Sequence, residues 1–223
     1  MVDAATQRIN MVESQVLTSD VTDRRILRAM RQIPRERFVP AHMAALAYMD
    51  EAVAITPADT GATRRWLLAP RVLAKLLQLA DIGDDDCVLD VGSGSGYSAA
   101  VLAGMARTVV ALESNVKLAE EARRNLAEIA LDNASVVLGE LTAGCINKAP
   151  YDAIVVQGAV AGAPETLFDQ LKDGGRLVAI VTENGLGKAT LWRRLGRSVD
   201  AWTAFDAAAP ALSEFGRPPV FVL

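Results

Sequence analysis

The chain has 223 residues, of which 51% are hydrophobic, with a mean hydropathy of +0.21 and a formal net charge of −4. This length and apolar content suffice for one folded α/β domain with a full core. Acidic residues outnumber basic ones, 27 to 23, with no long basic block, so we expect no nucleic-acid partner. With no leader-like start and no run long enough to cross a bilayer, we expect a cytoplasmic protein without a membrane partner.

The two cysteines, Cys87 and Cys145, have neither metal-ligand spacing nor a CxxC pattern. This spacing predicts no metal site and favours a reducing compartment.

The first part of the chain is predicted to be helical and rich in loops. Helical periodicity runs over residues 4–33 with a break near residues 18–20, where Asp20 or Thr22 is predicted to cap the second helix. A short helix is predicted over 41–46. A longer helix follows over 69–80, with Pro70 suited to its first turn.

Beyond residue 80, apolar strands and amphipathic helices alternate. The strands are predicted at 87–91, 108–112, 134–138, 152–157 and 175–182, and the helices at 97–105, 116–130 and 164–171. This alternation is typical of a doubly wound, mostly parallel α/β sheet. After Gly187 the pattern becomes short and alternating, including residues 219–223, which predicts antiparallel edge strands. We therefore expect an N-terminal extension (1–80) packed on a Rossmann-like core (81–223) within one structural domain.

A glycine-rich turn follows the first predicted core strand. Gly92, Gly94 and Gly96 alternate after Asp90, and a helix pattern begins at Tyr97. A strand, glycine turn and helix in this order hold a nucleotide-like ligand at the carboxyl edge of a sheet. A dinucleotide motif would place its third glycine at position 97, where Tyr97 stands, so a nicotinamide cofactor is disfavoured.

The pattern Asp90-x-Gly92-x-Gly94-x-Gly96 instead resembles the first motif of S-adenosylmethionine-dependent methyltransferases. Glu113, at the end of the next strand, is placed to accept hydrogen bonds from two ribose hydroxyls. Glu140 stands where the resemblance implies an acid near the adenine amino group. The implied cofactor-binding residues are Asp90, Gly92, Ser93, Gly94, Gly96, Glu113 and Glu140.

Several blocks resemble one family in order along the chain: residues 11–15, 33–40, 47–50, 92–103, 118–122 and 170–178. Over residues 10–182 the chain is similar to protein-L-isoaspartate (D-aspartate) O-methyltransferases. The resemblance implies a cytoplasmic repair enzyme that transfers the methyl group of S-adenosyl-L-methionine to the carboxylate of an isoaspartyl residue in a damaged protein, leaving S-adenosyl-L-homocysteine. Such a carboxylate is already ionised at neutral pH, so positioning and desolvation matter more than a base. We assign no catalytic residue and expect His42 to be a surface or packing residue rather than a base.

The segment before the helix at 70 departs from that family. Its Thr-Ile-Ser-Gln-Pro motif reads Trp66-Leu67-Leu68-Ala69-Pro70 here, and an insertion of about six residues falls around 56–65. Arg64 and Arg65 could bind an acceptor carboxylate or form a solvated basic pair. Trp66 could stack on a substrate or pack as a staple. Leu68 would suit a less polar acceptor, and Gln157 could orient the acceptor or cap its strand.

These departures leave several functions open. The leading hypothesis is an isoaspartyl O-methyltransferase, and within it the acceptor could instead be a different, less polar molecule. The alternative is a non-catalytic relative that binds S-adenosylmethionine or its demethylated product. A nicotinamide-dependent reductase is the least favoured, and the sequence does not choose an oligomeric state.

Overall fold

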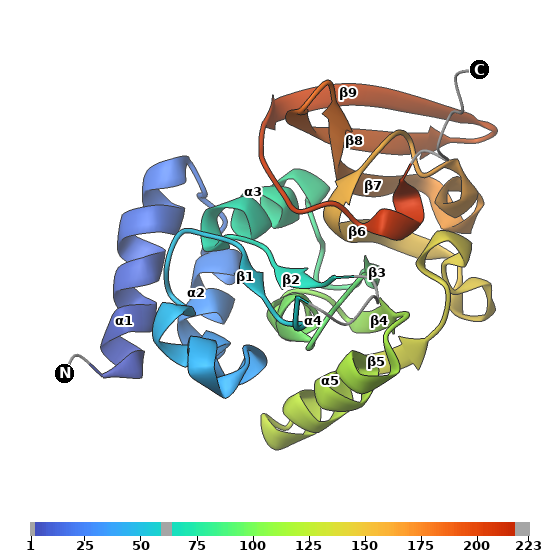
Figure 1. Cartoon of the computed structure of the whole chain (residues 1–223). Helices are drawn as coiled ribbons and strands as arrows, with labels where there is room; N and C mark the ends of the chain where they lie inside the picture. The colour runs from blue at the N-terminus through green and yellow to red at the C-terminus, as the bar shows by residue number, and fades with distance from the viewer. Residues whose placement is uncertain (1–2, 59–63, 217–223) are drawn as a thin grey trace, which may run out of the picture.

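A seven-stranded sheet forms the centre of the molecule in the computed structural model, which describes residues 3–58 and 64–216 (Figure 1). The strand order is β5-β4-β3-β6-β7-β8-β9. The strands are β3 (Cys87–Val91), β4 (Thr108–Glu113), β5 (Ala134–Leu138), β6 (Tyr151–Val160), β7 (Leu171–Glu183), β8 (Leu186–Leu195) and β9 (Ser198–Asp206). The strands from β5 to β7 pair in parallel, and β8 and β9 add antiparallel pairs at one edge. The predicted doubly wound, mostly parallel sheet with antiparallel edge strands is confirmed. The strand predicted over residues 219–223 lies outside the described residues.

One face of the sheet is covered by the α-helix that precedes β3 and by the two that follow β3 and β4. These helices are α3 (Pro70–Ala80), α4 (Tyr97–Ala103) and α5 (Val116–Glu128). They contact β6 and β7, β3 to β5, and β4 and β5 respectively. Pro70 begins α3 because a helix leaves its first N–H groups unpaired, so proline loses no hydrogen bond there. Their apolar sides form one large buried cluster with this face of the sheet.

The opposite face is covered by short 3₁₀ turns over Leu141–Ala143, Ile146–Lys148 and Glu165–Gln170. The helix predicted over 164–171 is present as a 3₁₀ helix over Glu165–Gln170. The segment between Pro164 and the start of β7 is short, and Gln170 is drawn inward to bond the neighbouring turns. Its side-chain amide donates to Ala143 O (2.8 Å) and accepts from Cys145 N (2.8 Å). These bonds tie the end of the 3₁₀ helix to the neighbouring turns.

The N-terminal segment packs helices against α3. It comprises α1 (Ala4–Met11), a π-turn (Val12–Val16), a 3₁₀ turn (Leu17–Ser19) and α2 (Arg24–Gln32). The N-cap of α2 is Asp23, which accepts from Arg25 N at 2.8 Å, so the prediction of Asp20 or Thr22 as the cap is wrong. Asp20 adopts φ 62°, the left-handed conformation with which a helical segment commonly ends.

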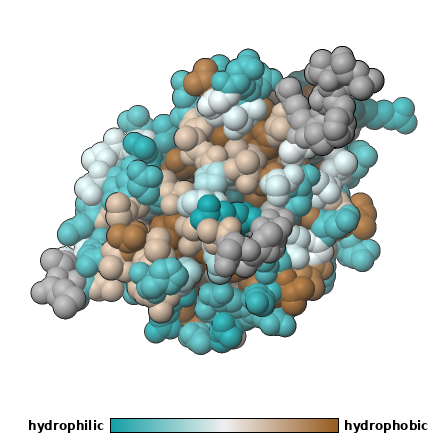
Figure 2. All heavy atoms as spheres, in the orientation of Figure 1, coloured by the Kyte–Doolittle hydropathy of each residue, from teal (hydrophilic) through white to brown (hydrophobic). Residues whose placement is uncertain are grey.

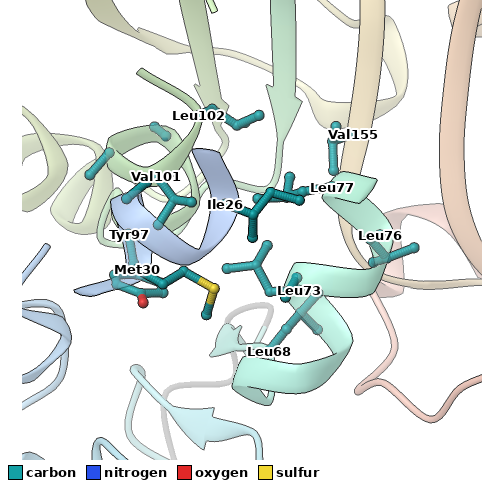
Figure 3. Close-up of a cluster of buried hydrophobic side chains, with 14 of the residues drawn as sticks. Ile26, Met30, Leu68, Leu73, Leu76, Leu77, Tyr97, Val101, Leu102 and Val155 are labelled. Carbon is teal, nitrogen blue, oxygen red and sulfur yellow. The ribbon is translucent and has the colours of Figure 1, made fainter. Parts of the chain in front are cut away.

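The core between α2 and α3 is closed by large aliphatic side chains. Ile26 and Met30 of α2 lie beside Leu73 and Leu77 of α3, with Leu68 at the edge of the group (Figure 3). Short 3₁₀ turns over Arg35–Phe38 and Ala41–Leu46 follow α2, so the short helix expected at 41–46 is a 3₁₀ turn. In the part of the chain that the structure describes, no helix has the length and apolar character needed to cross a bilayer.

A small antiparallel pair lies beside the central sheet. It consists of β1 (Val53–Ala54) and β2 (Trp66–Leu67), with Val53 opposite Leu67. We call residues 53–58 together with 64–67 the hairpin. Of the predicted insertion, residues 59–63 lie outside the described residues. Figure 1 shows β1 and β2 close to the ends of β3 and β4, so the hairpin borders the edge where the glycine turn lies.

The chain returns to the same edge after β9. Pro210 O accepts from Ala159 N at 2.9 Å, and Leu212 N donates to Ala159 O at 2.8 Å. A 3₁₀ turn over Ser213–Phe215 ends the described chain near β6 (Figure 1). Three segments distant in sequence thus meet at the carboxyl ends of the strands.

Candidate functional site

The glycine turn joins β3 to α4 as the sequence predicts. Gly92, Gly94 and Gly96 have φ values of 77°, 57° and 98°, a region that residues with a β-carbon rarely adopt. The N–H groups of Gly92 and Ser93 donate to Leu112 O at 2.9 and 3.2 Å, which ties the turn to the end of β4. The glycines are therefore required by the backbone, and the turn lies at the predicted edge of the sheet.

Glu113 ends β4, and its side chain is fully buried. One carboxylate oxygen, Oε2, accepts from Gly94 N at 2.8 Å. The other, Oε1, accepts from Ser114 N at 2.8 Å and from Asn115 N at 2.9 Å. A carboxylate has about four lone-pair directions, so three are taken by backbone N–H groups alone. The fold therefore fixes this carboxylate beside the glycine turn.

The fourth donor to Glu113 is Arg65, whose side chain is only 1% exposed. Arg65 Nε lies 3.1 Å from Glu113 Oε1, and Arg65 Nη2 donates to Ser114 Oγ at 2.7 Å. The outer edge of the guanidinium forms an ion pair with both carboxylate oxygens of Glu214. Burial raises the pKa of Glu214, but the hydrogen bonds and charge of Arg65, together with hydrogen bonds from Ser114 and the backbone, outweigh this effect and hold that pKa below its usual range.

This cluster corrects the interpretation of Arg64 and Arg65 as a solvated pair. Arg64 is exposed, and its guanidinium stacks 4.9 Å from the centre of the Trp66 ring. Arg65 is instead a buried residue with two carboxylate partners. A guanidinium out of water needs such partners, because an unpaired buried charge is strongly unfavourable.

Apolar side chains cover the glycine turn itself. A β-carbon built on Gly94 would lie 2.6 Å from Ile55 Cδ1, and one on Gly92 would lie 3.4 Å from Leu212 Cδ1. Ser93 Oγ is buried and has no hydrogen-bond partner among the described residues. Figure 2 shows a small hydrophilic area on this side of the molecule, ringed by apolar atoms. The turn is closed off by side chains of the hairpin and of the C-terminal segment.

The polar groups around the glycine turn suit a nucleoside cofactor, but other side chains fill the space that such a cofactor would need. The unpartnered Ser93 hydroxyl, the left-handed glycines and the fixed Glu113 carboxylate suit a polar nucleoside. However, Ile55 fills the cradle at Gly94, and Arg65 takes the remaining acceptor position of Glu113. In this conformation the residues do not fit S-adenosylmethionine.

Asp90, predicted to frame the cofactor, is fully buried beneath the turn. Its oxygens accept from Ser98 Oγ at 2.6 Å and from Gln157 Nε2 at 2.7 Å. Burial raises the pKa of Asp90 to about 7 despite these two hydrogen bonds. Asp90 thus joins β3, α4 and β6 beneath the turn. Glu140 is exposed in the segment after β5.

The residues predicted for the acceptor do not gather around one space. Leu68 is 3% exposed and belongs to the hydrophobic core (Figure 3), while Trp66 on β2 is partly exposed. Gln157 is buried, and its amide is used on Asp90. His42 is exposed, as expected.

Sequence reasoning missed Ile55, Ser114 and Glu214 at this site. Ser114 directly follows Glu113 and could have been found from that position alone. Glu214 stands 149 residues after Arg65, and only the return of the chain from β9 brings the two together. An isolated aliphatic residue such as Ile55 carries no sequence signal for covering a glycine turn.

The parallel sheet, the glycine turn after β3 and the acid that ends β4 define a methyltransferase of the Rossmann-like α/β class. The family model described as Protein-L-isoaspartate(D-aspartate) O-methyltransferase (PCMT) matches residues 7–202. The chain belongs to this family.

Individual relatives agree with this membership. The chain is 42% identical over 175 residues to a protein-L-isoaspartate O-methyltransferase of Methanoculleus marisnigri, covering 78% of this chain and 77% of that protein. It is 41% identical over 168 residues to the enzyme of that name from Protochlamydia amoebophila, covering 75% and 77%. A solved protein-L-isoaspartate O-methyltransferase superposes with a TM-score of 0.79 at 26% identity, over 95% of this chain and 67% of that one. The fold is shared with a beta-aspartate methyltransferase from Plasmodium falciparum in complex with S-adenosyl-L-homocysteine (TM-score 0.75, 20% identity, 93% and 98% covered).

Proposed function

We propose that this chain is an S-adenosyl-L-methionine-dependent O-methyltransferase that esterifies the carboxylate of isoaspartyl residues in damaged proteins of the cytoplasm. One observation supports this most directly. This chain, a member of the family, has the glycine turn at 92–96, and three backbone N–H groups fix the Glu113 carboxylate beside that turn. The proposed cofactor-binding residues remain Asp90, Gly92, Ser93, Gly94, Gly96, Glu113 and Glu140.

The side chains of the site suit an acceptor that is already ionised. A carboxylate needs no base at neutral pH, because its pKa lies near 4. Asp90 is buried and occupied by Ser98 and Gln157, and the only histidine of the sequence is exposed. The protein's contribution would therefore be to exclude water and to hold the acceptor in line.

The acceptor contacts differ from those of the family's usual motif. Trp66 and Arg64 are the predicted acceptor residues whose side chains reach the surface at the hairpin. We propose that they contact the acceptor, with Arg64 donating to its carboxylate. Arg65 would contribute to the acceptor site from the position next to Arg64 and Trp66. The buried side chains of Leu68 and Gln157 would support this acceptor wall from the protein interior.

The test is transfer of a labelled methyl group. The purified chain is incubated with radiolabelled S-adenosylmethionine and an isoaspartyl peptide, and in parallel with the aspartyl peptide of the same sequence. The expected result is a base-labile methyl ester on the isoaspartyl peptide alone. Absence of label on both peptides, while an active family member labels the first under the same conditions, would reject the proposed activity.

A second candidate is a non-catalytic relative that binds S-adenosylmethionine or S-adenosylhomocysteine. The closed conformation favours it, because Arg65 occupies Glu113 and the hydroxyl residues of the usual acceptor motif are replaced by Trp66 and Leu68. Saturable binding of S-adenosylhomocysteine, without methyl transfer to isoaspartyl peptides or to a panel of small carboxylic acids, would select this candidate.

A further inference from the structure

We propose that the hairpin is an internal competitor of the nucleoside cofactor, with Arg65 as the residue that sets cofactor affinity. In this structure, which we call the closed conformation, Arg65 donates to the Glu113 carboxylate, and the Ile55 side chain fills the space beside Gly94 of the glycine turn. Cofactor binding then requires the hairpin to move away. The inference rests on the proposed function only in taking an S-adenosyl nucleoside as the ligand of this turn.

Arg65 donates a hydrogen bond to the Glu113 carboxylate where a hydroxyl group of a ligand would donate. Its Nε–H points at the carboxylate, 3.1 Å from Oε1 and 3.4 Å from Oε2. A ribose hydroxyl would donate to the one acceptor direction of this carboxylate that the backbone N–H groups leave free. Since Glu113 is fully buried and its other acceptor directions are taken by backbone N–H groups, both donors cannot be accommodated together.

Ile55 and Arg65 are delivered by one piece of backbone. Ile55 N donates to Arg65 O at 3.0 Å, and Arg65 N donates to Thr56 Oγ1 at 2.9 Å. Displacing Arg65 from Glu113 therefore shifts Ile55 away from Gly94 as well. The hairpin acts as a unit that fills two parts of the frame at once.

Opening the hairpin exchanges one donor to Glu113 for another. Glu113 keeps its three backbone N–H bonds, and a ligand hydroxyl takes the place of Arg65 Nε. The movement also takes Arg65 away from Ser114, and Glu214 of the C-terminal segment stays paired with it only by moving as well. These contacts of Arg65 oppose opening, so the wild type should bind the nucleoside more weakly than a chain without them.

The same movement reaches the acceptor side. Trp66, the first residue of β2, directly follows Arg65 and stands at the position of the family's threonine. Opening the hairpin for the nucleoside therefore also rearranges the wall proposed to meet the acceptor. The expected order is cofactor first and isoaspartyl substrate second.

The test compares S-adenosylhomocysteine binding by calorimetry in wild type, Arg65→Gln, Arg65→Lys and Arg37→Gln. Arg37→Gln is the control, because it removes the same charge from an exposed side chain that does not touch Glu113. We expect Arg65→Gln to bind at least about tenfold more tightly and Arg37→Gln to stay within about twofold of wild type. Arg65→Lys, which keeps the charge but loses the fork of donors, should lie between them. Circular dichroism confirms that each variant is folded.

Unchanged or weaker binding by folded Arg65→Gln overturns the inference. So does absence of binding in every variant.

These results are separable from the test of function. Tighter binding by Arg65→Gln with no methyl transfer supports the competitor and rejects the isoaspartyl activity. Methyl transfer by the wild type, together with equal affinity of wild type and Arg65→Gln for S-adenosylhomocysteine, supports the isoaspartyl activity and rejects the competitor.

Discussion

Replacing Asp90 by asparagine should remove most of the pH dependence of stability above pH 5. Asp90 is fully buried, and its oxygens accept from Ser98 and Gln157. Burial raises its pKa, and the nearby Glu113 carboxylate adds to this rise. The two hydrogen bonds offset it in part, and the resulting pKa is about 7. Asparagine has nearly the same shape and cannot ionise.

The sign follows from a folded-state pKa above the unfolded value of 3.8. The folded protein holds this proton more tightly, so its stabilising effect is complete below pH 4 and is lost as pH rises through about 7. The two values lie about three pH units apart, which corresponds to about 4 kcal/mol. Asp90→Asn should therefore be more stable than wild type at pH 8, and the difference should shrink toward pH 5.

The assay is urea unfolding followed by circular dichroism at pH 5, 6, 7 and 8. Asp152→Asn is a control of opposite sign. Burial raises the pKa of Asp152, but hydrogen bonds from Cys87 N and Lys172 Nζ outweigh this and lower it overall. Its stabilising effect is therefore present across this whole range, so Asp152→Asn should lower stability by the same amount at each pH. A difference between Asp90→Asn and wild type that does not change from pH 5 to pH 8 would refute the reasoning.

Other variants test the packing at the site by thermal and urea denaturation. Gly94→Ala should lose about 1 kcal/mol, because its left-handed backbone disfavours a β-carbon while Ile55 Cδ1, the end of a flexible side chain, can turn aside. Gly174→Ala, also left-handed but with open space, should lose a similar amount; a much larger loss in Gly94→Ala would show that Ile55 is held rigidly. Arg35→Met should lose about 3 kcal/mol by leaving two buried carbonyls unpaired. Arg37→Met, at an exposed side chain, should change stability by less than about 0.5 kcal/mol, and a similar loss in both arginine variants would count against the buried bonds.

The sequence predicted those parts of the fold that local patterns determine. Strands β3 and β5 have the predicted bounds, since alternation of apolar strands and helices is visible within short windows. The glycine turn and Glu113 were found because their spacing is fixed by the strand ends. The helix over 164–171 is a 3₁₀ helix whose last residue, Gln170, bonds the neighbouring turns through its side chain, and no local pattern reveals those bonds.

The closed state of the site could not be predicted in the same way. The pairing of Arg65 with Glu214 depends on how the C-terminal segment returns to β6. Arginine beside a predicted loop is more often solvated than buried, so local reasoning favoured the wrong environment. Leu68 was placed by alignment with a serine, but the direction of its side chain depends on packing against α2 and α3.

The buried Arg35 fixes main chain beside the proposed acceptor wall. Its guanidinium donates to Ala47 O at 2.6 Å and to Leu68 O at 2.7 Å. Because these bonds reach only carbonyl groups, they do not depend on the side chains carried there. We therefore expect side chains of the proposed wall to be exchangeable on a main chain that stays where it is.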